Sequence, residues 1–265
     1  MRAFRSELIR IRRPAFLFGG IGLMAVFAGV VSIFIFTSAE SAPAAPSQTG
    51  QGPGAYTVAE IASPGGFLTA LPTVSRLAGV ILLALWAIAV ATDYSTGLIR
   101  ILAQAHPNRT RLLGGKIAAL SVFTLLATTV TTLVVVVFAR PLARLEGIPI
   151  EAWKTDFASH LGKGLLDFTI AGLVWGLIGL MLAVLTRSSA IAIGIGLGFL
   201  LVVESLISIV APSSSSYLPG GTLDTLAAGG NDQLAWGAAL GLVVLYGVIA
   251  TIVSLVVFRT RDIVS

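Results

Sequence analysis

Residues 168–210 read FTIAGLVWGLIGLMLAVLTRSSAIAIGIGLGFLLVVESLISIV, and this stretch decides the fold class. It holds two apolar runs, 168–186 and 190–210, on either side of Arg187. Each run has roughly the 20 residues that a helix needs to cross about 30 Å of hydrocarbon. The one acidic residue within these runs is Glu204. The stretch therefore predicts two membrane-spanning helices joined by a short polar link.

The same signal recurs along the whole chain of 265 residues. Hydrophobic residues make up 56% of the sequence and charged residues 11%, against about 25% charged in a soluble domain. In lipid, a helix satisfies its own backbone hydrogen bonds. We therefore predict an all-α integral membrane protein, in which residues 15–265 form one six-helix transmembrane domain. The other four predicted spans are 15–36, 72–92, 117–139 and 234–258.

The first predicted span could be mistaken for a cleaved signal peptide, because five arginines precede it and small residues follow it. A signal peptide has an apolar core of only about 7 to 15 residues, whereas 15–36 is uncharged throughout. We expect this span to be retained. Residues 1–14 place apolar side chains among the arginines, which is typical of an amphipathic helix on a membrane surface. The alternative is a positive tail that only fixes topology.

The basic residues indicate the orientation of the chain, because cytoplasmic loops carry an excess of lysine and arginine. With the N-terminus inside, twelve of the 17 basic residues fall on the cytoplasmic side. We therefore expect a multi-pass protein of a bacterial plasma membrane with both termini in the cytoplasm. Residues 37–66, rich in Ser, Ala, Pro and Gly, become a largely irregular outer loop. The outer loop 140–163 is expected to include a short helix at the membrane surface, and the last outer loop, 211–221, is expected to form turns.

Several kinds of chemistry have no support in the sequence. There is no cysteine, and the motifs His-Glu-x-x-His and Gly-x-Ser-x-Gly are absent. Gly114-Gly115-Lys116 lacks the spacing of a phosphate-binding P-loop. The basic residues lie beside apolar runs instead of forming one stripe, which argues against nucleic-acid binding. We expect no catalytic, metal or cofactor site in this chain.

The segment 93–116 reads DYSTGLIRILAQAHPNRTRLLGGK and lies between the second and third predicted spans. Ser95 and Thr96 can cap a helix, apolar residues follow at helical spacing, and Pro107 can end it. This pattern predicts a short amphipathic cytoplasmic helix with a basic tail, suited to a groove on a cytosolic partner. The alternative is an ordinary loop whose arginines only set the orientation.

This segment resembles the coupling region of the permeases of type 2 ABC transporters. The resemblance lies in an acidic residue, a Thr-Gly-x-x-Arg helix, a basic stretch and a Gly-Lys pair that opens the third span. The matching residues are Asp93, Thr96, Gly97, Arg100, Arg109 and Lys116. The six-span layout, the Thr-Arg-Ser-Ser link at 186–189 and the Leu-Pro-Gly-Gly segment at 218–221 extend the resemblance over nearly the whole chain.

The resemblance implies a permease dimer, of identical or related chains, docked on separate ATPase subunits that bind ATP and Mg. Residues 93–116 would then contain the coupling helix, and residues 1–14 would form the elbow helix. The implied function is ATP-driven export, and the apolar composition favours a hydrophobic or amphipathic substrate. The long outer loop 37–66 departs from the family pattern.

Glu204 is the acid that lies well inside a predicted span, where a charge costs about 3 kcal/mol. We expect it to line a substrate path, to lie at the dimer seam, or to be a protonated acid within the bundle. Arg76 is expected to reach the membrane interface, and Asp167 to meet water or Lys163. A secondary ion-coupled transporter, which needs paired ionisable groups at mid-membrane, and a non-transporting scaffold or immunity protein are the alternative functions.

Small residues within spans allow helix backbones to approach closely in lipid. The pairs Gly172/Gly176 and Gly194/Gly198 both have the Gly-x-x-x-Gly spacing. We predict close helix packing at both pairs, within the bundle or across a dimer. A flexible hinge is the alternative use.

Overall fold

The computed structural model describes residues 14–39, 56–97 and 109–260, and every element in these ranges is helical. Six segments are long and apolar enough to cross a membrane, as predicted. The structure is thus that of a multi-pass helical membrane protein. The six segments are α2 (Pro14–Thr37), α4 (Leu71–Ser95), α6 (Arg109–Leu145), α7 (Phe157–Thr186), the continuous α8 (Ser189–Gly198), η3 (Phe199–Val203) and α9 (Glu204–Val210), and α12 (Trp236–Thr260).

Two of the spans are much longer than their apolar runs. Helix α6 begins at Arg109 and α7 at Phe157, well before the predicted 117 and 168. Hydropathy marks the part of a helix that can lie in hydrocarbon, but backbone hydrogen bonds continue through polar residues outside it. The predicted elbow helix falls mostly on residues 1–13, which lie outside the described residues, as do 98–108 of the predicted coupling segment.

Short helices occupy the connections between the spans. A capping box formed by Thr57 and Glu60 starts α3 (Val58–Ile61), and η1 (Gly66–Leu68) follows. The short helix expected between 140 and 163 is present as η2 (Glu151–Lys154). Residues 211–221, predicted as turns, instead contain α10 (Pro212–Ser215) and the first part of α11 (Pro219–Ala227). Helices α10 and α11 each begin at a proline, which is favoured in a first turn because an N–H there would have no partner within the helix.

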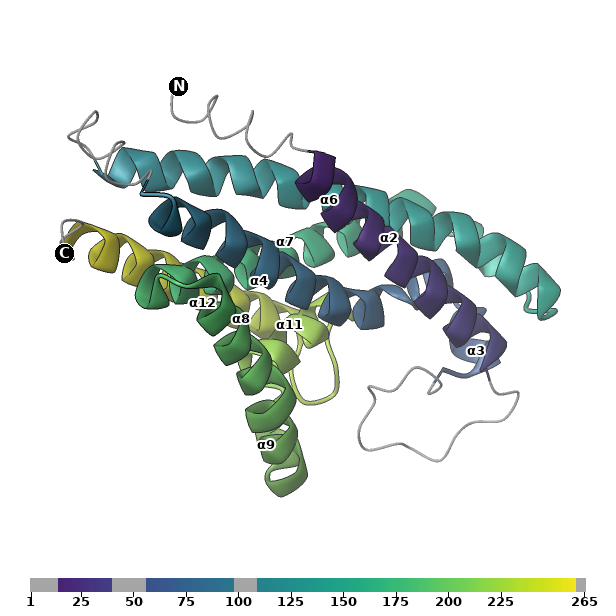
Figure 1. Cartoon of the computed structure of the whole chain (residues 1–265). Helices are drawn as coiled ribbons and strands as arrows, with labels where there is room; N and C mark the ends of the chain where they lie inside the picture. Colours follow the sequence, from purple (N-terminus) through teal and green to yellow (C-terminus); the bar gives the residue numbers. More distant parts are fainter. Residues whose placement is uncertain (1–13, 40–55, 98–108, 261–265) are drawn as a thin grey trace.

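Helices α4 and α7 form the centre of the bundle, with α2 and α6 on one side and α12 on the other (Figure 1). Glycines of α7 make this close packing possible. A Cβ added at Gly176 would lie 2.4 Å from the ring of Trp86, and one at Gly179 would lie 2.2 Å from the carbonyl oxygen of Leu83. The predicted close approach at the first Gly-x-x-x-Gly pair is therefore confirmed within the chain.

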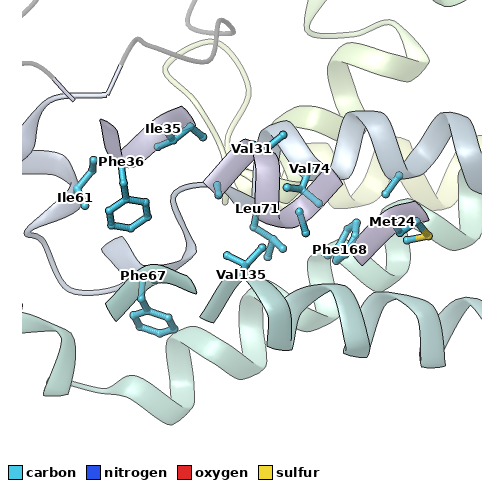
Figure 2. Close-up of a cluster of buried hydrophobic side chains, with 14 of the residues drawn as sticks. Met24, Val31, Ile35, Phe36, Ile61, Phe67, Leu71, Val74, Val135 and Phe168 are labelled. Carbon is cyan, nitrogen blue, oxygen red and sulfur yellow. The ribbon is translucent and has the colours of Figure 1, made fainter. Parts of the chain in front are cut away.

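An apolar cluster joins α2, α4, α6 and α7 to the chain between α2 and α4 (Figure 2). At its aromatic end, the Trp153 ring lies 6.3 Å from that of Phe36 and 6.1 Å from that of Phe67. The Trp153 indole N–H also donates to the carbonyl oxygen of Ile61 at 2.8 Å. This contact satisfies the one polar group of a buried tryptophan and fixes α3 and η1 against the ends of the spans.

The fifth span behaves differently from the others. Helix α8 packs on α4 and α7, but η3 and α9 diverge from the bundle (Figure 1). Gly194 and Gly198 have open space where a Cβ would lie. The second Gly-x-x-x-Gly pair therefore makes no close helix contact within the described residues. Leu206 and Ile209 are exposed, as befits a surface that faces lipid or another chain.

Candidate functional site

Helix α4 carries two charged residues, Arg76 near its start and Asp93 near its end. At 1.5 Å per residue they lie about 25 Å apart along the helix, close to opposite ends of the bundle. Each meets a residue of opposite charge from another helix. We call these two places the Arg76 end and the Asp93 end.

At the Asp93 end, two residues predicted to belong together are in contact. The Lys116 ammonium group, near the start of α6, bonds to the Asp93 carboxylate and donates to the carbonyl oxygen of Ala89 at 2.8 Å. Asp93 is 3% exposed and Lys116 7%. Because a buried charge is costly unless it is paired and hydrogen-bonded, this double contact fixes the end of α4 against the start of α6.

Thr96 and Gly97 end α4. The Thr96 hydroxyl donates to the carbonyl oxygen of Thr92 at 2.8 Å, and the Gly97 N–H donates to that of Tyr94 at 3.2 Å. Gly97 has a φ of +68°, the left-handed conformation in which glycine commonly terminates a helix. Thr96 therefore closes the preceding helix; the helix that it was expected to cap falls on residues 98–108, outside the described residues.

The two other residues of the predicted coupling set are placed less fully. Arg109 is the first residue of α6, and Arg100 lies outside the described residues. The described residues thus bring together Asp93 and Lys116, and place Thr96 and Gly97 at the end of α4, three and four residues after Asp93.

A second turn in the chain follows α7. Arg187 adopts a φ of +55° and its N–H donates to the carbonyl oxygen of Ala183 at 2.8 Å. A residue other than glycine in this conformation is uncommon. Ser188 then caps α8 with its side chain, which accepts a hydrogen bond from the Ile191 N–H at 3.4 Å. The Thr-Arg-Ser-Ser link is thus a tight connection between the fourth and fifth spans.

At the Arg76 end, three elements meet. Arg76 of α4 places Nε 3.7 Å from Oδ2 of Asp224 on α11. The Glu204 carboxylate, at the start of α9, accepts a hydrogen bond from the N–H of Gly220 in the first turn of α11 at 2.7 Å. Arg76 was expected only to reach the membrane interface; its side chain is 35% exposed and also contributes this ion pair.

Asp224 is a polar residue that sequence reasoning missed. Its side chain is 12% exposed, and Oδ1 is buried without a hydrogen-bond partner. Burial raises the pKa of the Asp224 carboxyl to about 7; Arg76 opposes the rise and Glu204 adds to it. The signal available in the sequence was an acid at helical spacing after Pro219, but only if 219–227 had been recognised as a helix.

Asp167 also has a specific partner. It is 3% exposed and accepts the indole N–H of Trp236 at 3.1 Å, while the Lys163 ammonium lies 5.0 Å from the centroid of that indole ring. Lys163 thus contacts the same tryptophan as Asp167, and its charge also acts on the Asp167 carboxylate, in line with the expected proximity.

The interior between the two ends is largely apolar, and the polar side chains that pair there are uncharged. Trp86 donates to the Thr124 hydroxyl at 3.0 Å, and the hydroxyls of Thr128 and Thr169 lie 2.9 Å apart. Such pairs satisfy hydroxyl groups in a setting without water. The charged chemistry of the described residues within the bundle is therefore concentrated towards its ends.

No family model matches the chain, and no curated protein is similar to it.

Proposed function

We propose that the chain is the membrane-spanning permease subunit of a type 2 ABC transporter. Two such subunits would work with separate ATPase subunits, which bind ATP and Mg, to export a hydrophobic or amphipathic compound across a bacterial plasma membrane. Both termini and residues 93–116 would lie in the cytoplasm. The observation that carries the proposal is the buried contact of Lys116 with Asp93 and Ala89.

This contact suits the transmission of force. The segment between Gly97 and Arg109 connects α4 to α6, so an ATPase that pushes on it pushes on both helices. Because Lys116 joins the two helices beside this segment, they would move as one unit instead of separating. Helix α4 in turn packs on α7 through the close glycine contacts. Packed elements of this kind pass small displacements on as rigid-body shifts.

The proposal is tested by purifying the chain in mild detergent from its native cells, identifying any ATPase that elutes with it, and reconstituting the complex in vesicles. We expect ATP hydrolysis together with export. Arg100→Ala and Gly97→Val should retain hydrolysis but lower transport by about tenfold, which corresponds to about 1.4 kcal/mol of lost coupling. Gly97→Asn is the matched control, because asparagine tolerates the left-handed conformation and a Cβ there meets open space.

Other outcomes would contradict the proposal. Coupling that is unchanged in Arg100→Ala and Gly97→Val would reject the assignment of the coupling segment. Transport driven by an ion gradient without ATP would favour a secondary transporter. A chain that purifies without an ATPase and transports nothing would favour a scaffold or immunity protein.

A further inference from the structure

The Arg76 end contains more negative than positive charge. Two carboxylates, Glu204 and Asp224, meet one guanidinium, so the three groups carry a net charge of −1 when all are ionised. Glu204 is 7% exposed, and Oδ1 of Asp224 is buried. Burial of an uncompensated charge is far more costly than protonation of a carboxylate.

The two carboxylates are not equivalent. Glu204 accepts a hydrogen bond from the N–H of Gly220 at the start of α11, where the helix dipole favours a negative charge. Asp224 has the 3.7 Å contact with Arg76, which is longer than a hydrogen bond, and its Oδ1 is unpartnered. The ionised form is therefore better supported at Glu204 than at Asp224.

Other charged groups do not compensate Asp224. Helix α11 packs on α4, α7 and α12. Arg76 is the charged residue that α4 presents here, while Asp167 and Lys163 of α7 are both engaged with Trp236. Tyr246 of α12 donates to a backbone carbonyl, and Arg259 lies in the last turn of that helix, far along its length. The charge on Asp224 is thus governed by Arg76 and Glu204.

We propose that Arg76, Glu204 and Asp224 form a proton-binding site, in which Asp224 gains and loses one proton. Glu204, on α9, stays ionised and accepts the hydrogen bond from the first turn of α11. The proton moves between solvent and the Asp224 carboxylate, and no other bond forms or breaks. Uptake changes the charge of the cluster from −1 to zero. The Arg76 side chain, 35% exposed, lies beside Asp224 and marks the side from which water reaches it.

Loss of the proton changes how α11 is held. With Asp224 ionised, α11 is attached to α4 through the Arg76 ion pair and to α9 through Glu204. With Asp224 protonated, the first attachment loses its Coulomb attraction and the second remains. The site therefore makes the contact between α11 and α4 dependent on proton concentration. This inference does not rest on the proposed coupling to an ATPase.

The test is infrared difference spectroscopy of the purified full chain in lipid nanodiscs, without any ATPase, titrated from about pH 5 to about pH 9. We expect one carboxylic-acid C=O band that disappears with a midpoint near neutral pH. The band should be absent in Asp224→Asn. It should persist in Asp232→Asn, which makes the same change at an exposed aspartate in the next loop.

Two further variants test the roles of the neighbours. Arg76→Gln should move the midpoint to higher pH, and Glu204→Gln should move it to lower pH, each on the order of one pH unit. The amide oxygen of Glu204→Gln can still accept from the Gly220 N–H. A purely structural role for these residues would not shift the midpoint in opposite directions. The two variants therefore test the proton-binding site even if Asp224→Asn fails to fold.

Three results would overturn the proposal. They are the absence of a titrating carboxylic-acid band, a band that remains in Asp224→Asn, and a shift in the same direction for both neighbours. Disappearance of the band in Glu204→Gln would place the proton on Glu204 and reject the assignment to Asp224.

Discussion

The two ends of α4 are built from the same kinds of residue but differ in balance. At the Asp93 end, one lysine has two acceptors, Asp93 and the Ala89 carbonyl oxygen, and both side chains are buried. At the Arg76 end, one arginine pairs with Asp224, a second carboxylate, Glu204, lies near enough for its charge to act on both, and Oδ1 of Asp224 has no partner. A buried ion pair whose hydrogen bonds are complete thus holds two helices together as a fixed joint. Where buried acids outnumber the basic groups, one acid can instead change its protonation state.

The largest effect should come from breaking the fixed joint. Lys116→Met removes the ammonium group and leaves the buried Asp93 carboxylate without this partner. Loss of one member of a buried pair costs about 3 to 5 kcal/mol. Unfolding of the purified chain in mixed micelles, followed by circular dichroism, measures the loss.

The matched control for this prediction is Lys154→Met, the same change at an exposed lysine of η2. The double variant Asp93→Leu with Lys116→Met should regain much of the stability, because it removes both buried charges. If Lys116→Met unfolds like the control, the Asp93 end is not a fixed joint.

An intermediate effect is expected from pH at the Arg76 end. The pKa of Asp224 is raised in the folded chain from 3.8 to about 7, so the folded state holds this proton more tightly than the unfolded state. The resulting stabilisation is complete below about pH 4 and is lost as the pH rises through about 7. The difference is on the order of 4 kcal/mol.

The midpoint temperature of thermal unfolding of the wild type should therefore fall between about pH 4 and about pH 7, and this slope should flatten in Asp224→Asn. An equal dependence of stability on pH in the two proteins would show that Asp224 is not the titrating group. The comparison with Lys116→Met is informative here too, because that variant should keep the slope of the wild type while unfolding more easily.

The smallest of these effects concerns the packing that links the two ends. Gly179→Ala would place a Cβ 2.2 Å from a backbone oxygen of α4, and overpacking of this kind costs about 1 to 3 kcal/mol. Gly198→Ala is the control, because a Cβ there meets open space. Equal stability of the two variants in the same micelle assay would contradict the close contact of α4 and α7.

The spans could be predicted because hydropathy is a local property of the chain. Asp93 and Lys116 could be assigned to one segment, but neither their contact nor the cluster at the Arg76 end could be predicted. Asp224 follows the segment 211–221, whose prolines and glycines suggested turns, and its partners come from two distant parts of the sequence. The Gly-x-x-x-Gly pairs show the same limit: Gly176 packs on Trp86 while Gly194 meets open space, because the spacing identifies a small surface but not what covers it.

The π-helical turn η3 places Glu204 where it can meet α11. The N–H of Glu204 itself closes that turn by donating to the carbonyl oxygen of Phe199, five residues earlier. A π-turn holds one residue more than an α-turn, and each residue advances the side chains by about 100° around the axis. Deletion of one residue from η3 would turn Glu204 away from Gly220 while every charge in the sequence stayed in place. The site is therefore specified by residue count as much as by residue type, and an insertion or deletion upstream can abolish it without altering any of its members.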